Sequence, residues 1–228
     1  MVLVGEMAAG LAHEIKNPLA GIKVTLEVLA DELELSDEDQ DLFARVINET
    51  NRVEKLLKGL LNYARPPKLN YEQFDLNRLL DNSIQNMSMT GKTSSKEGVE
   101  FVRGFAADLP QLEADSAQLQ QVVLNIFLNA IEAMPEGGQI TVSTHKRDEE
   151  SLGIEITDTG KGIPEGVLAN IFQPFMTTKS KGSGLGLAIC KRIIEEHGGT
   201  IEANGYSSGG TQFVVILPCK RHHREALL

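Results

Sequence analysis

Two long stretches at the start of the chain carry hydrophobic residues at helical spacing. In the first stretch, small or apolar residues recur at steps of three and four positions; these are Ala8, Ala12, Ile15, Leu19, Ile22, Leu26, Leu29 and Leu33. The second stretch repeats this spacing at Phe43, Val46, Thr50, Val53, Leu57, Leu60 and Ala64. Such a sustained alternation is a heptad pattern. It predicts two long helices, the first ending near Leu33 and the second stopped by Pro66-Pro67.

A short polar turn joins the two predicted helices. Ser36 stands at the N-cap of the second helix, and Asp39 follows three residues later in the position of a capping box. In an antiparallel hairpin each helix has only one neighbour, so a broad apolar face cannot be buried within one chain. The second helix has such a face, because Ile47, Leu56 and Leu61 widen its seam. We therefore expect a homodimer that closes a four-helix bundle.

Beyond Pro67 the pattern changes to shorter stretches, which predict a second domain. Residues 68–72 are expected to form a linker, so we divide the chain into a hairpin at 1–67 and a second domain at 68–228. The second domain is predicted to contain helices from Asp75 to about Met89, from Asp115 or Ser116 to about Met134 and from Leu185 to His197, and strands at 99–102, 139–146, 152–158, 200–203 and 212–217. Strands and helices do not alternate strictly, which favours a mixed sheet with helices on one face. The fold class is α+β.

Composition and charge exclude several classes of protein. The 228 residues are 41% hydrophobic and 24% charged, as is typical of soluble globular proteins. A net charge of −10 argues against nucleic acid as a partner. Cys190 and Cys219 are spaced neither as a disulfide framework nor as metal ligands, and no apolar run approaches a membrane span. We expect a cytoplasmic protein; because the chain begins almost inside its first helix, the cytoplasmic portion of a longer, membrane-bound protein also fits.

The first predicted helix carries a histidine beside a carboxylate, His13-Glu14. His13 follows a seam residue, Ala12, so it is expected to face solvent on the flank of the seam. Asn17 lies one turn further on and completes a polar cluster, and Pro18 is expected to bend or loosen the helix there. A lone exposed histidine on such a helix is most often only a surface residue. A role for His13 therefore depends on a reactant supplied elsewhere.

The helix that begins near Asp115 is apolar but is interrupted by two asparagines. Asn125 and Asn129 are spaced i and i+4, so they share one face, where their amide oxygens can reach one magnesium ion or its waters. A plain polar stripe on an amphipathic helix explains the same pattern.

A second cluster follows the strand at 152–158. Asp158 ends this strand and is followed by Gly160 and Gly162. A carboxylate in a crevice can accept a hydrogen bond from an exocyclic amine such as that of adenine, and the glycines let the backbone pass close to a flat base. The alternative is a surface turn with an Asx cap.

The third cluster is a glycine-rich loop that opens onto a helix, from Thr177 to Leu187. Its backbone N–H groups, the helix N-terminus and Lys179 or Lys181 suit a triphosphate. The spacing is not that of a Walker loop, and the loop does not follow a strand of a dinucleotide-binding unit. A flexible surface lid is the other interpretation.

Together and in this order, the clusters resemble the boxes of the GHKL (Bergerat) ATP-binding fold, a two-layer α/β sandwich with a mixed sheet. The two-asparagine helix, Asp158-x-Gly160-x-Gly162, Phe172-x-x-Pro174-Phe175 and Gly182-x-Gly184-x-Gly186 are similar to its N, G1, F and G2 boxes. With His13-Glu14-x-x-Asn17-Pro18 upstream, residues 5–217 resemble the catalytic core of a HisKA-type sensor histidine kinase.

The resemblance implies ATP and Mg²⁺ and a role for each matching residue. His13 would be the phospho-acceptor, Glu14 would accept the proton of the other ring nitrogen, and Asn17 would orient water for dephosphorylating a response regulator. Asn129 would bind the metal and Asp158 would read adenine. The other implied nucleotide-binding residues are Asn125, Gly160, Gly162, Phe172, Phe175, Thr178, Lys179, Gly182, Gly184, Leu185, Gly186 and Thr211.

The implied function is autophosphorylation of His13 and transfer of the phosphoryl group to an aspartate in the receiver domain of a response regulator, with phosphatase activity toward that regulator. Two departures stand out. Asn125 occupies the place where related hydrolases carry a catalytic glutamate, and residues 131–133 are Ile, Glu and Ala where many relatives carry an aromatic or basic residue. The alternatives are an ATPase that uses ATP as a conformational clamp, a non-catalytic dimerisation module, and an enzyme that acts mainly as a phosphatase.

Overall fold

The structure, a computed structural model, describes residues 2–33, 36–64, 68–89, 98–179, 182–206 and 209–220. The chain divides into two compact units, Met1–Lys68 and Leu69–Leu228. Two features predicted from the sequence, the helix stop at Pro66-Pro67 and the position of Lys181, lie outside the described residues. In the described part of the chain, no helix is both long and apolar enough to cross a membrane.

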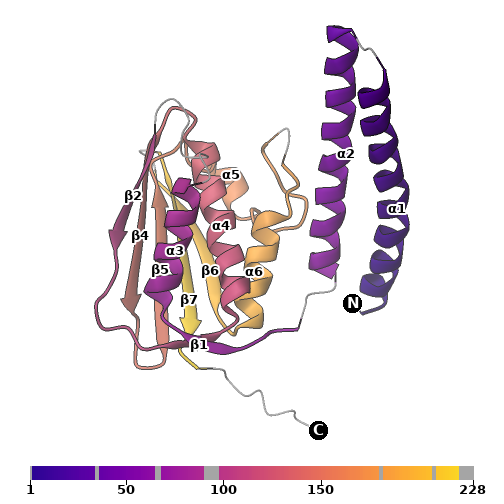
Figure 1. The fold of residues 1–228 in the computed structure, drawn as a ribbon. Coiled ribbons are helices and arrows are strands. Elements are labelled where there is room, and N and C mark those ends of the chain that lie inside the picture. The colour runs from indigo at the N-terminus through magenta and orange to yellow at the C-terminus, as the bar shows by residue number, and fades with distance from the viewer. Residues whose placement is uncertain are drawn as a thin grey trace. The chain divides into compact units, whose positions relative to one another are not determined.

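The first unit is a hairpin of two long helices, α1 (Val2–Glu32) and α2 (Asp37–Ala64), which lie side by side (Figure 1). The predicted capping box is present: the Ser36 hydroxyl donates to Asp39 Oδ2 at 2.6 Å and accepts from the Asp39 N–H at 3.2 Å. Helix α1 continues as α-helix through Pro18. The proline removes one backbone donor but does not end the helix.

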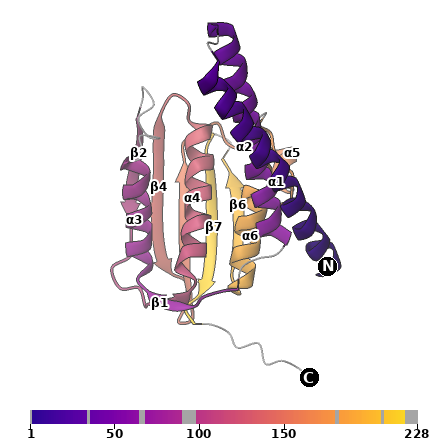
Figure 2. The same ribbon diagram turned by 45° about the vertical axis from the view of Figure 1, so that its right-hand side comes forward.

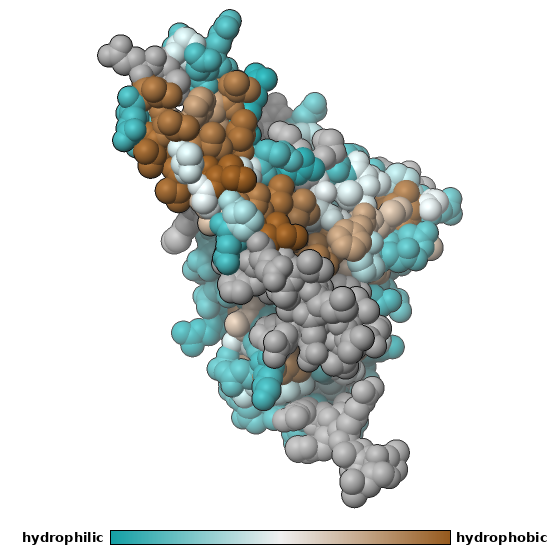
Figure 3. Space-filling model, turned by 90° about the vertical axis from the view of Figure 1, so that its right-hand side faces the viewer, coloured by the Kyte–Doolittle hydropathy of each residue, from teal (hydrophilic) through white to brown (hydrophobic). Residues whose placement is uncertain are grey.

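The hairpin leaves many of its apolar side chains exposed. Figure 3 shows them gathered along its surface, and the large ones among the described residues are Ile15, Ile22, Val24, Val28, Leu29, Leu33, Leu42 and Val46. The centre of the seam is different, because Thr50 is buried and its hydroxyl donates to the carbonyl oxygen of Val46 at 2.9 Å. One hairpin alone thus covers only part of its heptad face.

The second unit is a two-layer sandwich. Its five-stranded sheet has the order β2-β4-β5-β7-β6, built from β2 (Val99–Gly104), β4 (Gly138–Lys146), β5 (Ser151–Asp158), β6 (Thr200–Gly205) and β7 (Thr211–Pro218). The β2 and β4 strands are parallel and the other neighbours antiparallel. One face is covered by α3 (Leu76–Met89), α4 (Ser116–Ala133) and α6 (Gly186–Glu196), as Figures 1 and 2 show. This confirms the mixed sheet with helices on one face.

Three short elements escaped prediction. Strands β1 (Glu72–Phe74) and β3 (Leu112–Ala114) pair antiparallel as a separate ribbon, and α5 (Glu165–Leu168) is a single turn. Segments of three or four residues are too short to display a hydrophobic period. The β1 strand therefore begins inside the segment that the sequence assigned to a linker.

The core of the second unit lies between the sheet and its helices. Phe127 on α4 is fully buried, and its ring meets that of Phe101 on β2 edge-on, with centroids 5.0 Å apart. Leu80 and Ile140 are also completely buried, from α3 and β4. This apolar layer fixes α4, and with it the two asparagines, against the sheet.

The start of the second unit is anchored by a buried polar cluster. The backbone N–H of Asn70 donates to Asp115 Oδ2 at 2.9 Å, and the N–H of Asp115 donates to His197 Nε2 at 3.0 Å. Because Nε2 accepts, the opposite ring nitrogen of His197 carries the proton and donates to the carbonyl oxygen of Ile193, 2.7 Å away. The Tyr71 ring packs on His197 at 5.6 Å between centroids. His197 therefore has the structural role that its position at a helix end suggested.

Candidate functional site

Asp158 ends the central strand β5 and is 96% buried, with 4% of its surface exposed. Burial raises the pKa of its carboxyl group, and hydrogen bonds from the backbone N–H groups of Gly160 and Thr211 oppose this effect. The bond from Gly160 to Oδ1 measures 2.8 Å. A buried acceptor at a strand end is able to recognise the amino group of a base.

The turn after Asp158 passes so close to α4 that it requires glycine. A Cβ atom at Gly160 would lie 2.8 Å from the Ala133 Cβ and 2.9 Å from Asp158 Oδ1. The next residue, Lys161, donates its N–H to the carbonyl oxygen of Ala133 at 3.3 Å. These contacts hold the turn against the end of α4.

Thr211 lies beside Asp158 on the neighbouring strand β7. It is 3% exposed and is the register partner of Asp158 in the β5–β7 pair. The preceding Gly210 has φ +93° and passes over the carbonyl oxygen of Asp158. The structure thus brings Asp158, Gly160, Gly162 and Thr211 together, since Gly162 also lies against Gly210: a Cβ atom added to Gly162 would lie 3.1 Å from the Gly210 carbonyl oxygen.

The two asparagines of α4 have different neighbours. The Asn125 side chain hydrogen-bonds the thiol of Cys190 on α6, and burial raises the pKa of that thiol to about 12. The Cys190 Sγ also lies 3.8 Å from the carbonyl oxygen of Val122. A neutral thiol beneath the amide fixes Asn125 between α4 and α6. Cys190 is a supporting residue that sequence reasoning missed, because nothing in its own motif marks it.

Asn129 contacts the glycine-rich loop. Its Oδ1 accepts a hydrogen bond from Lys179 Nζ at 2.8 Å, and the same ammonium group pairs with the carboxylate of Glu132. An amide oxygen that already holds a cationic group has the donor chemistry that Mg²⁺ requires. Among the described residues no group of three or more His, Cys, Asp or Glu side chains gathers as a metal site.

The glycine-rich loop leads into the N-terminus of α6. Leu185 is the N-cap residue, and within the described part of the chain no side chain caps the helix. The first N–H groups of α6 are thus available for an anion. Gly184 has φ +66° and passes against the backbone of Phe175, where a side chain would collide. Gly182 donates its N–H to the carbonyl oxygen of Lys179 at 3.2 Å, which closes the loop.

The two phenylalanines that precede this loop differ. Phe172 is half-buried beneath Lys191, whose Nζ lies 6.0 Å from the ring centroid. Phe175 is 63% exposed and has φ +65°. Its backbone rather than its ring therefore makes the close contact with the loop. Thr178 is exposed.

The predicted phospho-acceptor cluster lies on α1. His13 and Glu14 belong to this helix, but their side chains lie outside the described part of the chain. Asn17 is described and exposed, one helical turn beyond His13.

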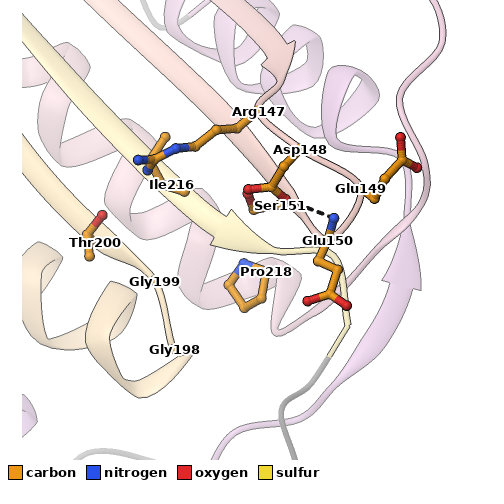
Figure 4. Close-up of a pocket in the computed structure, with 10 residues that line it drawn as sticks. All are labelled: Arg147, Asp148, Glu149, Glu150, Ser151, Gly198, Gly199, Thr200, Ile216 and Pro218. Atoms are coloured by element: carbon orange, nitrogen blue, oxygen red, sulfur yellow. Dashed lines mark hydrogen bonds between the residues drawn. The ribbon is translucent and has the colours of Figure 1, made fainter.

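A separate open cleft of about 620 Å³ lies at the opposite end of the sheet (Figure 4). It is lined by Ser151, where β5 begins, and by Arg147 and Gly199, among others. Asp158 is at the other end of the same strand, roughly 23 Å away at 3.3 Å per residue. The cleft is therefore not the predicted nucleotide site.

Comparison with known proteins identifies both units. The family of histidine kinase-, DNA gyrase B- and HSP90-like ATPases matches residues 114–221, and the His Kinase A (phospho-acceptor) domain matches residues 3–68. Sensor histidine kinase ZraS of Escherichia coli O157:H7 is 37% identical over 220 residues, which are 96% of this chain and 47% of ZraS. The chain belongs to the sensor histidine kinase family. It spans about half the length of this relative.

Solved histidine kinases have the same fold. Full-length ShkA in complex with AMPPNP superposes with a TM-score of 0.79 at 26% identity, covering 93% of this chain and 45% of ShkA. Histidine kinase ThkA in complex with the response regulator protein TrrA gives 0.70 at 29% identity, covering 97% of this chain and 64% of that one. The C-terminal unit of this histidine kinase is thus its GHKL ATP-binding domain.

Proposed function

We propose that ATP phosphorylates His13 in this histidine kinase and that the phosphohistidine then passes its phosphoryl group to an aspartate of a response regulator. The observation that carries the proposal is the convergence of two separate recognition points in one domain. Asp158 offers a buried acceptor at one point, while Asn129, Lys179 and the open N-terminus of α6 offer cation-binding and anion-binding groups at the other. This combination suits the adenine and phosphate ends of one nucleotide.

The nature of residue 125 favours phosphotransfer over hydrolysis. Water needs a base to become a good nucleophile, and position 125 carries an amide whose side chain is engaged by the Cys190 thiol. An amide cannot accept the proton of water. The γ-phosphoryl group is therefore transferred to a better nucleophile rather than to water. This argues against the alternative of an ATPase that uses ATP as a conformational clamp.

Each residue of the site has a separate task in the proposed reaction. Asp158 orients the adenine, and Lys179 with the α6 N–H groups holds the phosphates. Asn129 would hold Mg²⁺, which when bound screens the charge of the phosphates. A nitrogen of the His13 imidazole attacks the γ-phosphorus, the bond from that phosphorus to the bridging oxygen breaks, and ADP leaves. Glu14 accepts the proton from the other ring nitrogen.

The decisive test is the His13→Ala variant with radiolabelled ATP. We expect the wild-type protein to acquire label that is lost in acid and kept in base, and His13→Ala to acquire none while binding ATP with unchanged affinity. His145→Ala is the matched control, because His145 lies on β4 in the ATP-binding domain. Label that persists in the His13 variant, or that survives acid, contradicts the assignment.

The exposed apolar face of the hairpin supports a homodimer. Among the hairpin side chains that the structure describes, eight large apolar ones are exposed, for example Val24 and Leu42, at 57% each. A second copy of the hairpin has the same face and the same heptad spacing, so two copies complete a four-helix bundle. We propose this dimer as the form in which His13 is phosphorylated.

Phosphatase activity toward the regulator is a second proposed function. Its support is the exposure of Asn17 one turn from His13, because an exposed amide beside the phosphohistidine site can hold a water molecule. We expect Asn17→Ala to slow the decay of phosphorylated regulator while His13 is still labelled by ATP. Unchanged decay in this variant contradicts the phosphatase role of Asn17.

A further inference from the structure

The ammonium group of Lys179 is held by two residues of α4 that lie three positions apart. Asn129 Oδ1 accepts from Lys179 Nζ at 2.8 Å, and the Glu132 carboxylate forms an ion pair with the same nitrogen. Residues at i and i+3 share a helix face. Lys179 itself comes from the glycine-rich loop, where its backbone N–H donates to Thr177 Oγ1 at 3.1 Å. The pair therefore connects the loop to α4.

Packing of the domain gives no reason for a glutamate at position 132. The side chain of Glu132 is 57% exposed, and that of Lys179 is 33% exposed. Within the described residues, the polar partner of this carboxylate is Lys179. An ion pair this exposed contributes little to folding stability. We therefore expect the Glu132–Lys179 ion pair to affect the role of Lys179 in ligand binding rather than the stability of the domain.

The negative charge of Glu132 is unexpected close to a site for phosphates. A carboxylate one turn from Asn129 lies near the place where the anionic phosphates are proposed to bind, so alone it would repel them. Lys179 removes this repulsion while it stays paired. A lysine ammonium has three donors, and Lys179 would free one of them if Asn129 held Mg²⁺ instead. Lys179 can then keep Glu132 and still donate twice to phosphate oxygens.

We propose that Glu132 is a positioning residue, which holds the loop lysine Lys179 at the phosphate end of the nucleotide. The proposal rests on the proposed function of the ATP site and adds a residue to it. Glu132 acts through Lys179, in the way that outer-shell partners orient the groups that bind a ligand. A lysine without such a partner would have to be ordered again for each nucleotide.

The first experiment measures AMPPNP binding with Mg²⁺ present by isothermal titration calorimetry, for wild type and Glu132→Gln. We expect the variant to bind about two- to fivefold more weakly, the range of a partly exposed charge pair. If Glu132 only repelled the phosphates, the same variant would bind more tightly. Adenosine has no phosphate, so its affinity is expected to be equal for both proteins and serves as a check that the adenine end is intact.

The second experiment repeats the Glu132→Gln change in a Lys179→Gln background. Without the lysine there is nothing to position, and only the repulsion remains. We therefore expect the sign to reverse: the double variant should bind AMPPNP as well as, or more tightly than, Lys179→Gln alone. Such a reversal in a double-mutant cycle reports the interaction between the two residues, and a merely structural role of Glu132 would not produce it.

The matched control is Glu136→Gln, which removes the same charge four residues further on. Glu136 is exposed, just beyond the end of α4, and its variant should bind AMPPNP like wild type. Equal or tighter binding by Glu132→Gln, or equal effects in both lysine backgrounds, overturns the proposal for Glu132 while leaving the ATP site in place. Failure of the wild-type protein to bind AMPPNP would instead reject the proposed function together with the inference that rests on it.

Discussion

The hairpin and the ATP-binding domain treat their apolar residues in opposite ways. Of the ten large hydrophobic side chains that are exposed in the described part of the chain, eight belong to the hairpin and two, Phe175 and Tyr206, to the domain. The domain buries Phe127, Leu80 and Ile140 completely. The domain therefore has a core of its own, whereas the hairpin has half of one.

This difference separates two kinds of stability. Burial of apolar surface is the main favourable term in folding, and the domain obtains it within one chain. The hairpin is expected to obtain it from a second copy, so its stability depends on protein concentration. A substitution on the exposed hairpin face should therefore alter assembly, and a substitution in the domain should alter ligand binding without altering assembly.

The largest expected effect is on the dimerisation of the hairpin. Ile22 is 50% exposed in one chain, and we expect Ile22→Asp to convert the dimer to a monomer. Burial of a whole isoleucine contributes about 1.5–3 kcal/mol, so burial of the exposed half of Ile22 contributes about 1.5–3 kcal/mol over two copies, or one to two orders of magnitude in the dimer dissociation constant. The unpaired charge of aspartate in the interface adds to this loss. Analytical ultracentrifugation measures this directly.

Ala20→Asp is the control for that experiment. Ala20 is exposed and lies seven residues before Glu27, on a face of α1 that already carries a charge. We expect this variant to remain dimeric. A wild-type chain that sediments as a monomer at micromolar concentration would reject the proposed four-helix bundle, whatever the variants do.

An intermediate effect is expected on ATP binding by the domain. Asp158→Asn removes the charged acceptor for adenine, and a hydrogen bond to a charged group is worth about 1.5–3 kcal/mol. We expect ATP to bind about 10- to 150-fold more weakly, while the dimer dissociation constant is unchanged. Equal ATP affinity in the variant would show that the base is read elsewhere.

The same variant should change the pH dependence of stability. The pKa of Asp158 is raised in the folded protein by burial, so the folded state binds this proton more tightly than the unfolded state. The free energy of unfolding of the wild type therefore falls as pH rises from the ordinary carboxyl range through the raised pKa. Relative to wild type, we expect Asp158→Asn to gain stability over this window and to keep the gain above it. Urea unfolding of residues 69–228 at several pH values provides the measurement.

The smallest expected effect concerns the turn of the hairpin. Ser36→Ala removes the side chain that accepts from the Asp39 N–H, and loss of an N-cap costs about 1 kcal/mol. We expect a lower thermal midpoint for the hairpin at fixed protein concentration and no change for the domain. Ser36→Thr keeps the hydroxyl and should restore the midpoint; a fall as large as that of the alanine variant would show that the cap is not the cause.

The sequence predicts elements well where a hydrophobic period runs for several turns. Both hairpin helices and α4 are of this kind, and Ser36 and Asp115 mark helix starts by side-chain chemistry that the structure confirms. Strands β1 and β3 are too short for a period. Their pairing depends on contacts between segments about forty residues apart, which no local pattern contains.

The candidate site shows the same limit at the level of single side chains. Asp158 and its glycines are predictable because one motif contains the carboxylate and the turn that supports it. The partners of Asn125 and Asn129 are not, because Cys190 and Lys179 lie 65 and 50 residues away and meet α4 only in the folded domain. Glu132 is recognisable in the sequence as a departure from the family pattern, but its ion pair with Lys179 is recognisable only in the folded domain.

The buried cluster of Asp115 and His197 sets the length of the tether between the two units. Because Asn70 is fastened to Asp115, the ATP-binding domain and its first residues turn as one piece. Helix α2 ends at Ala64, so six Cα steps remain, which span at most about 22 Å when fully extended. Inserting or deleting residues in this tether, with every side chain of the ATP site unchanged, should therefore change the rate at which bound ATP phosphorylates His13.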